Sequence, residues 1–244
     1  SGIAGFANDA AENFYLPEKY TDPFGNITKL TYYRPYDLFI QSSTDAMGNT
    51  SGVAKDRATD EPRFDYRVLA PIEMVDPNGN HAEVYFDILG RVVALAVKGK
   101  GNEGDNFTDF TDTLANPELA SLATFFGQMD LDEKQTRDWL GNATARHVYY
   151  FGETRNADGT IAWGTHPACA CGIVGEQHVS QLARDEKSPL QAAFEYSDGM
   201  GSVVVKKIQA EPDPKLPEAE QKLRWIANGK TILNNKGKPV KHYE

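Results

Sequence analysis

The sequence predicts a mainly β protein, in which antiparallel hairpins form a curved, open sheet with one short α-helical insertion. The central stretch reads as three strands, Asp65–Val75, Asn80–Phe86 and Arg91–Lys98, rich in Val, Tyr, Phe and Ile. Tight turns of one design join these strands and recur along the chain. Convincing helical signals are confined to residues 106–141. Together these observations predict repeated hairpins rather than a helical or α/β fold.

The turn between the first two central strands shows the shared design, Asp-x-x-Gly. An Asp in the first position can accept hydrogen bonds from turn N–H groups, and Gly takes the left-handed position that closes the hairpin. Six such turns occur, at Asp22 and Gly25, Asp45 and Gly48, Asp76 and Gly79, Asp87 and Gly90, Asp198 and Gly201, and, with Asn for Asp, Asn234 and Gly237. We interpret these twelve residues as structural turn residues, not as acid/base pairs or calcium ligands, because the turn position explains the carboxylates.

The N-terminal third carries further strand signals around the first two turns. Residues 1–13 are small and polar and predict a loose lead-in. Phe14–Tyr20 is expected as the first strand, and Asn26–Tyr33 alternates with period two. After the break at Pro35, Tyr36–Thr44 is expected to run into the second turn.

Two helices are predicted in the insertion. Asn116 is expected to cap the first, which starts at Pro117 and runs to about Phe126. Asp130 is expected to cap the second, which ends before Gly141. The strand pattern then returns in the following segments: Arg146–Phe151, Thr160–Trp163, Ile173–Ser180, Leu190–Ser197, Ser202–Ala210 and Leu223–Leu233. We therefore expect hairpin repeats at 1–105, a helical insertion at 106–141 and hairpin repeats at 142–244, as one continuous unit.

Composition excludes several classes of function. The formal net charge of −10 and the pI near 5.0 argue against a nucleic acid or an anionic membrane as the main partner. No apolar run approaches the roughly 18–20 residues that span a bilayer. No phosphate-binding loop, dinucleotide fingerprint or Gly-x-Ser-x-Gly elbow occurs, so we expect no cofactor and no catalysis. The first residue is Ser, and we expect a piece of a longer polypeptide.

Two groups of residues offer alternatives to a purely structural role. His166, Cys169, Cys171 and His178 carry the ligand types of a tetrahedral zinc site, although their spacing matches no familiar ribbon or finger. Aromatic side chains that could stack on sugars are Tyr32, Tyr33, Tyr36, Phe39, Tyr149, Tyr150, Phe151, Trp163 and Trp225. Such strand aromatics more often fill the faces of a sheet.

Five phrases of the sequence also carry a family resemblance. They are TDPFGNITKLTYY, STDAMGNTSG, DYRVLAPIEMVDPNGNHAEVYFDILGRVVALAVKGKG, FEYSDGMGSVVVKKIQAE and TILNNKGKPVKHYE. These phrases cover about two-thirds of the chain and resemble the Rhs (YD-repeat) region of the B component of Tc insecticidal toxin complexes. The resemblance implies that the repeats wind as a β-sheet strip into a hollow shell around a toxic C-terminal segment. The chain lacks recognisable versions of that family's other parts, including its self-cleaving aspartate site.

This resemblance implies a structural function as a wall section of a secreted bacterial toxin's encapsulating shell. The implied partners are the neighbouring Rhs repeats of the same polypeptide and the toxic cargo segment. Unpaired sheet edges additionally predict self-association. Two rivals stand beside this reading: a carbohydrate-binding surface module and a zinc-dependent enzyme using His166, Cys169, Cys171 and His178.

Overall fold

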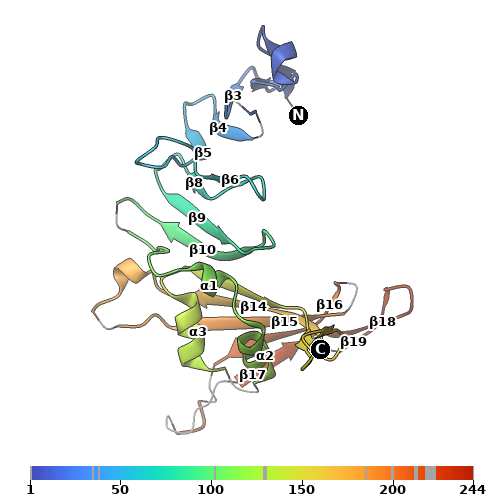
Figure 1. Cartoon of the computed structure of the whole chain (residues 1–244). Coiled ribbons are helices and arrows are strands. Elements are labelled where there is room, and N and C mark those ends of the chain that lie inside the picture. The colour runs from blue at the N-terminus through green and yellow to red at the C-terminus, as the bar shows by residue number, and fades with distance from the viewer. Residues whose placement is uncertain are drawn as a thin grey trace. The chain divides into compact units, whose positions relative to one another are not determined.

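The computed structural model describes residues 2–34, 36–37, 39–101, 103–128, 131–184, 186–198, 201–211, 214–217 and 224–243 (Figure 1). The chain divides into two compact units. Unit 1 comprises Ser1–Tyr85 and Ala96–Gly104, and unit 2 comprises Phe86–Leu95 and Asp105–Glu244. Both are built mainly from antiparallel strands, and the helices of the insertion lie in unit 2. The predicted fold class, mainly β with hairpin repeats and a short helical insertion, is confirmed.

Unit 1 is a meander of short strands. Its strands are β1 Ile3–Gly5, β2 Lys19–Thr21, β3 Ile27–Tyr32, β4 Ile40–Thr44, β5 Thr50–Val53, β6 Phe64–Asp65, β7 Ala70–Pro71, β8 Glu73–Val75 and β9 His81–Phe86, whose last residue belongs to unit 2. The hydrogen-bonded order is β1-β2-β3-β4-β5-β8-β9, and each of these neighbouring pairs is antiparallel. The strands β6 and β7 form a separate hairpin. A 3-10 helix, η1 Ala10–Asn13, follows β1.

Three predicted strands of unit 1 are wrong in their extent. The predicted strand Tyr36–Thr44 begins only at Ile40, as β4. Phe14 and Tyr15 have φ angles of 56° and 54°, which end η1 in the left-handed region, so only Lys19 and Tyr20 of the predicted first strand lie in a strand, β2. The predicted strand Asp65–Val75 is interrupted, because Leu69 has a φ of 52° and turns the chain between β6 and β7. Non-Gly residues adopt this conformation only when their surroundings impose it, so it leaves no signature in strand propensity.

Unit 1 buries little apolar surface. Among its described residues, the buried hydrophobic ones are Ala10, Val53, Ala54, Phe64 and Ala96, of which only Val53 and Phe64 are larger than Ala. The buried charged residues within the same described ranges are Glu73 and Glu83, at 6% and 7% exposure. A unit with so small a core depends more than usual on hydrogen bonds, turns and ion pairs.

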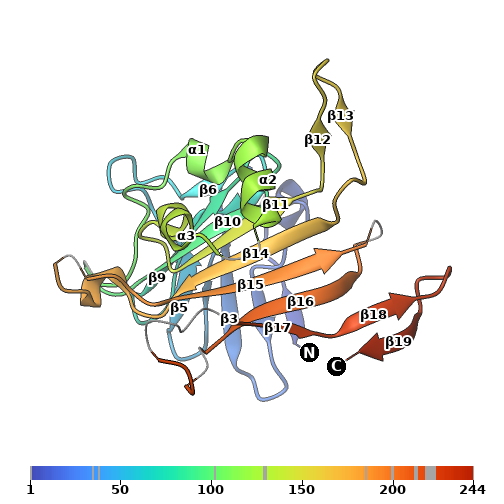
Figure 2. The same cartoon turned by 90° about the horizontal axis from the view of Figure 1, so that it is seen from below.

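Unit 2 is a longer-stranded sheet with helices on one face (Figure 2). Its elements are β10 Val92–Lys98 (of which 96–98 belong to unit 1), α1 Asp112–Ala115, α2 Leu119–Gly127, α3 Glu133–Leu140, β11 Ala145–Tyr150, β12 Thr154–Arg155, β13 Ile161–Ala162, β14 Ala168–Gly175, η2 Val179–Gln181, β15 Leu190–Ser197, β16 Val203–Ala210, β17 Arg224–Asn228, β18 Lys230–Leu233 and β19 Pro239–Tyr243. The strand order is β10-β11-β14-β15-β16-β17, while β12–β13 and β18–β19 are separate hairpins.

The helices begin at caps that differ from the predicted ones. Thr111 caps α1, accepting a hydrogen bond from Leu114 N at 3.4 Å. Asn116, predicted as an N-cap, instead follows the end of α1, and α2 starts at Leu119. Asp132 caps α3 and accepts from Gln135 N at 3.0 Å. The predicted cap Asp130 lies outside the described residues.

The core of unit 2 lies between these helices and the sheet. Phe125 of α2 packs its ring 4.6 Å from the ring of Trp139 in α3 and 5.8 Å from that of Phe194 in β15. On the sheet side, Cys171 and Ile173 of β14 are at most 1% exposed. In unit 2 the helical insertion therefore covers one face of the sheet with apolar side chains. The described residues of unit 1 have no such helical cover. None of the helices in the described ranges is long and apolar enough to cross a membrane.

Candidate functional site

The repeated Asp-x-x-Gly turns form one hydrogen-bonding pattern. In the turn at Asp76, Oδ1 accepts from Asn78 N at 2.8 Å and from Asn80 N at 2.9 Å, and Oδ2 accepts from Asn80 Nδ2 at 3.0 Å. The backbone closes the turn, because Gly79 N donates to Asp76 O at 3.0 Å with a φ of 80°. One carboxylate thus holds both the turn and the residue that directly precedes the next strand, β9.

The turns at Asp22 and Asp45 repeat this pattern, with Asn26 and Asn49 in the place of Asn80. These hydrogen bonds stabilise the carboxylate and lower the pKa of Asp22, Asp45 and Asp76 below the usual value of an aspartate. The Asn after the Gly is a part of the motif whose side-chain role the sequence analysis missed.

The remaining turns vary the pattern. Asn234 uses its Oδ1 to accept from Lys236 N at 2.9 Å and Lys238 N at 3.0 Å. Asp198 accepts from Ser202 N at 2.9 Å, and Gly201 N closes that turn on Asp198 O at 3.2 Å. Residues 199 and 200 of this turn lie outside the described ranges.

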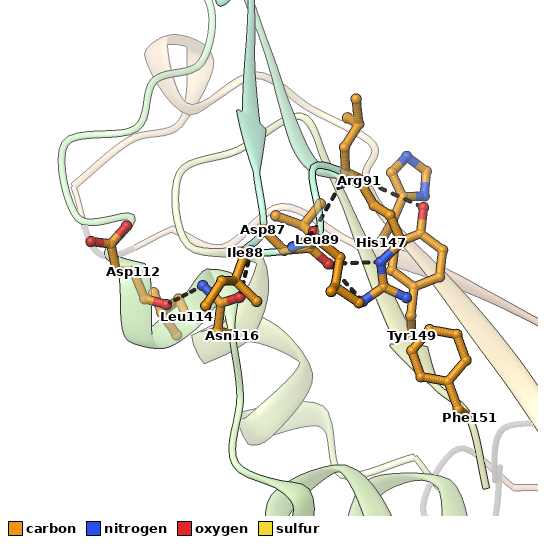
Figure 3. Close-up of polar contacts among 12 residues, drawn as sticks. Asp87, Ile88, Leu89, Arg91, Asp112, Leu114, Asn116, His147, Tyr149 and Phe151 are labelled. Atoms are coloured by element: carbon orange, nitrogen blue, oxygen red, sulfur yellow. Dashed lines mark hydrogen bonds and ion pairs between the residues drawn. The ribbon is translucent and has the colours of Figure 1, made fainter. Parts of the chain in front are cut away.

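Asp87 itself is buried, unlike the first residues of the other turns, although Ile88 and Leu89 of the same turn are exposed (Figure 3). Asp87 is 3% exposed, and its carboxylate accepts from Leu89 N and Arg91 N and also from Arg91 Nε at 2.7 Å and Arg91 Nη2 at 2.6 Å. The Arg91 guanidinium carbon lies 4.4 Å from the Tyr149 ring centroid and 4.8 Å from that of Phe151. Such ion pairing and cation–π contact fix the turn against β11.

The same turn also holds the helical insertion. Ile88 N donates to Asn116 Oδ1 at 2.8 Å, and Asn116 Nδ2 donates to Asp112 O at 3.0 Å (Figure 3). Asn116 therefore acts as a bridge between the turn and the end of α1. Its sequence context resembles an N-cap, but a contact 28 residues distant decides its role.

A buried arginine ties three segments together next to this turn. Arg146 is 1% exposed, and its guanidinium donates to Val93 O at 2.8 Å, His147 O at 2.7 Å and Leu114 O. Burial lowers the pKa of Arg146 to about 10 and that of His147 below its usual value. Arg146 Nε is buried with no partner among the described residues. The carbonyl contacts join β10, β11 and α1.

Unit 1 holds a second charged network. Glu73 and Glu83 stand directly opposite each other in the β8–β9 register, where two carboxylates would repel. Arg63 pairs with both, Lys98 pairs with both, and His81 Nδ1 lies 2.8 Å from Glu73 Oε1. The network links residues from β8, β9 and β10 with Arg63, the residue that precedes β6.

The predicted zinc ligands are not brought together. Cys169 and Cys171 lie on the buried face of β14 as free thiols, and burial raises the pKa of Cys169 to about 12 and that of Cys171 still further. His178 Nδ1 pairs with Asp105 Oδ2 at 2.8 Å, and the His166 ring lies beside Tyr150. Across the described part of the chain, no group of three or more His, Cys, Asp or Glu side chains is placed to hold a metal ion.

The predicted aromatic residues fall into three environments. Tyr33, Tyr36 and Phe39 cluster with Phe64 and Tyr66 in unit 1. The Tyr32 hydroxyl donates to Pro17 O. Tyr149 and Phe151 contact the Arg91 guanidinium, and Tyr150 stacks on Phe126 of α2. Trp225 is half-buried, with its ring 5.4 Å from that of Phe194. Trp163 is 67% exposed, which leaves its ring faces in solvent.

Comparisons with known proteins find the fold in Tc toxins. A crystal structure of TcdB2-TccC3 matches 99% of this chain with a TM-score of 0.68 at 17% identity. The Photorhabdus luminescens Tc holotoxin pore with a mutated TccC3 matches 99% with a TM-score of 0.66 at 16% identity. The chain spans only 11% and 13% of those two chains. No family model and no curated protein matches the sequence. The similarity therefore shows a Tc-toxin-type fold.

Proposed function

We propose that this chain is a wall section of an Rhs-type shell that encloses the toxic segment of a secreted bacterial Tc-type toxin. Its role is structural and not catalytic. Its partners are the neighbouring repeats of the same polypeptide and the enclosed segment. Its place of action is outside the bacterial cell. The observation that carries the proposal is the turn network, which repeats one hydrogen-bonded corner along a fold shared with TcdB2-TccC3.

The repeated Asp-x-x-Gly turns suit a wall because each turn fixes the strand register of its own hairpin. A carboxylate at the first turn position accepts from the N–H of the residue just before the next strand, as Asp45 does from Asn49. Register is then set locally, without a central core, and a long strip can be extended hairpin by hairpin. The small apolar core of unit 1 agrees with this design.

The charged networks supply what the core does not. Arg63 and Lys98 neutralise Glu73 and Glu83, and Arg91 neutralises the buried Asp87. Each of these contacts joins different strands or a strand and its turn. They act as cross-links between segments of the chain.

Limited proteolysis of the complete polypeptide that carries this sequence tests the proposal. The C-terminal segment of the intact polypeptide is expected to resist a protease that cuts it rapidly once the polypeptide is denatured. Asp87→Ala, which releases Arg91 and the turn, is expected to speed the cutting of that segment, whereas Asn234→Ala, at an exposed turn, leaves it unchanged. Equal cutting rates in the intact and denatured polypeptides would refute enclosure.

A further inference from the structure

Unit 2 contains a cavity that the wall function does not use. Its volume is about 660 Å³, within the range of about 300–1,000 Å³ that is typical of small-molecule sites. The start of α2 forms one wall, and the segment from the end of β11 through β12 forms the other. Figure 2 shows the β12–β13 hairpin standing away from the sheet on the side where α2 lies.

Charged and polar groups that are free to bind a ligand line this cavity. Glu118, Arg155 and His166 face it, and none of their side chains has a hydrogen bond or ion pair within the described residues. Glu153 also lines it and has one oxygen engaged, since Oε2 accepts from Phe151 N at 3.0 Å. Planar carboxylate, guanidinium and imidazole groups present several donors and acceptors in fixed directions.

An exposed tryptophan stands beside the cavity. Thr154 and Ala162 are partners in the β12–β13 register, so Trp163 follows one step beyond Ala162, opposite the lining residue Glu153. Thr154 Oγ1 and Thr165 Oγ1 are 2.9 Å apart and hold the base of the hairpin closed. Trp163 is 67% exposed, a large fraction for an aromatic packing residue, and it lies across the hairpin from the lining residue Glu153.

The inner end of the cavity is apolar. A recess of about 70 Å³ shares Ala123, Tyr150 and His166 with the cavity and is lined further by Phe126 and Tyr196. The lining groups sum to two carboxylates against one guanidinium and one imidazole, so the site offers no excess of positive charge. This balance disfavours phosphorylated or sulfated ligands.

We infer that this cavity binds a neutral oligosaccharide. A sugar ring presents an apolar C–H face that suits Trp163, and hydroxyl groups that suit Glu118, Arg155 and His166. A sugar therefore combines apolar contacts with several hydrogen bonds, which matches the mixture of apolar and polar groups at the cavity. The inference is independent of the wall function, because the cavity contains none of the turn or ion-pair residues assigned to the wall.

Calorimetric titration of the whole chain with chitotriose, cellotriose and lactose tests the inference. At least one of these sugars is expected to bind with a millimolar or lower dissociation constant. Trp163→Ala is expected to weaken that binding about tenfold. Ala120→Trp, which places a large ring at an exposed position of the cavity wall, is expected to abolish it. The control is Phe24→Ala, which removes an aromatic ring that is 90% exposed in unit 1.

The outcomes separate cleanly. Weakened binding in Trp163→Ala and lost binding in Ala120→Trp, with full binding in Phe24→Ala and unchanged circular dichroism, support the site. Binding that survives both cavity variants places the sugar elsewhere and overturns the inference. So does the absence of binding by all three sugars at millimolar concentration. Because Trp163 and Ala120 are exposed, neither substitution is expected to prevent folding.

Discussion

The turn at Asp87, whose carboxylate is buried, offers the sharpest test of how the Asp-x-x-Gly turns stabilise the chain. Asp87→Ala removes the acceptor for Leu89 N and Arg91 N and the partner of the Arg91 guanidinium. Two backbone donors left without this acceptor cost about 1 kcal/mol each. The Arg91 side chain is 32% exposed, which reduces the lost ion pair to about 1–2 kcal/mol. The expected loss is about 3–4 kcal/mol.

Asn234→Ala is the matched control for this change. Asn234 makes the same two backbone hydrogen bonds, but the turn is exposed and has no ion pair, so water replaces the lost acceptor. The expected loss there is about 1 kcal/mol or less. The difference between the two variants therefore isolates burial and Arg91.

Urea unfolding followed by tryptophan fluorescence measures this difference. All three tryptophans, Trp139, Trp163 and Trp225, lie in unit 2, as does Asp87, so the signal reports the unit that carries the mutation. A loss of 3–4 kcal/mol also lowers the thermal midpoint by about 10 °C. If Asp87→Ala destabilises unit 2 no more than Asn234→Ala does, the reasoning from burial and ion pairing is wrong.

Three further predictions follow from the same contacts. The pKa values of Asp22, Asp45 and Asp76 are lowered by turn hydrogen bonds, so their contribution to the stability of unit 1 is present above about pH 4 and disappears as the pH falls through their folded values; amide exchange at the three turns across a descending pH series measures this, and protection that does not fall as these carboxylates become protonated would contradict it. Burial of Cys169 and Cys171 predicts that Ellman's reagent labels both thiols only at the rate of unfolding, and rapid labelling of the native chain would contradict that packing. The terminal strands of the sheet order, β1 and β17, predict concentration-dependent association of the isolated chain, against which a single monomeric species in sedimentation at high concentration would count.

Features that depend on residues close together in the sequence could be predicted best from the sequence. The Asp76 turn is specified by residues that lie within four positions of each other, so its residue types alone indicate its geometry. Strand extent was less accessible, because Phe14, Tyr15 and Leu69 adopt left-handed backbone angles that their residue types disfavour.

The partners of the charged residues could not be predicted from the sequence, because several of them lie far away along the chain. The spacing Asp87-x-x-Gly90-Arg91 permits the ion pair, but Tyr149 and Phe151, which flank the guanidinium, lie about 60 residues further along the chain. Asn116 shows the same limit, since its local context indicates a helix cap and its contact with Ile88 makes it a bridge. The cavity beside Trp163 depends on α2 and the β12–β13 hairpin meeting, which no single segment encodes.

The amino-acid sequence by itself determined the hairpin corners, the mainly β class and the position of the helical insertion, because hydrogen bonds within a few residues and periodic side chains specify them. The tertiary structure alone decided which turn aspartate is buried, which cations neutralise the buried carboxylates and where a cavity remains. Those features depend on desolvation and packing between segments far apart in the chain, and these energies exist only once the segments meet.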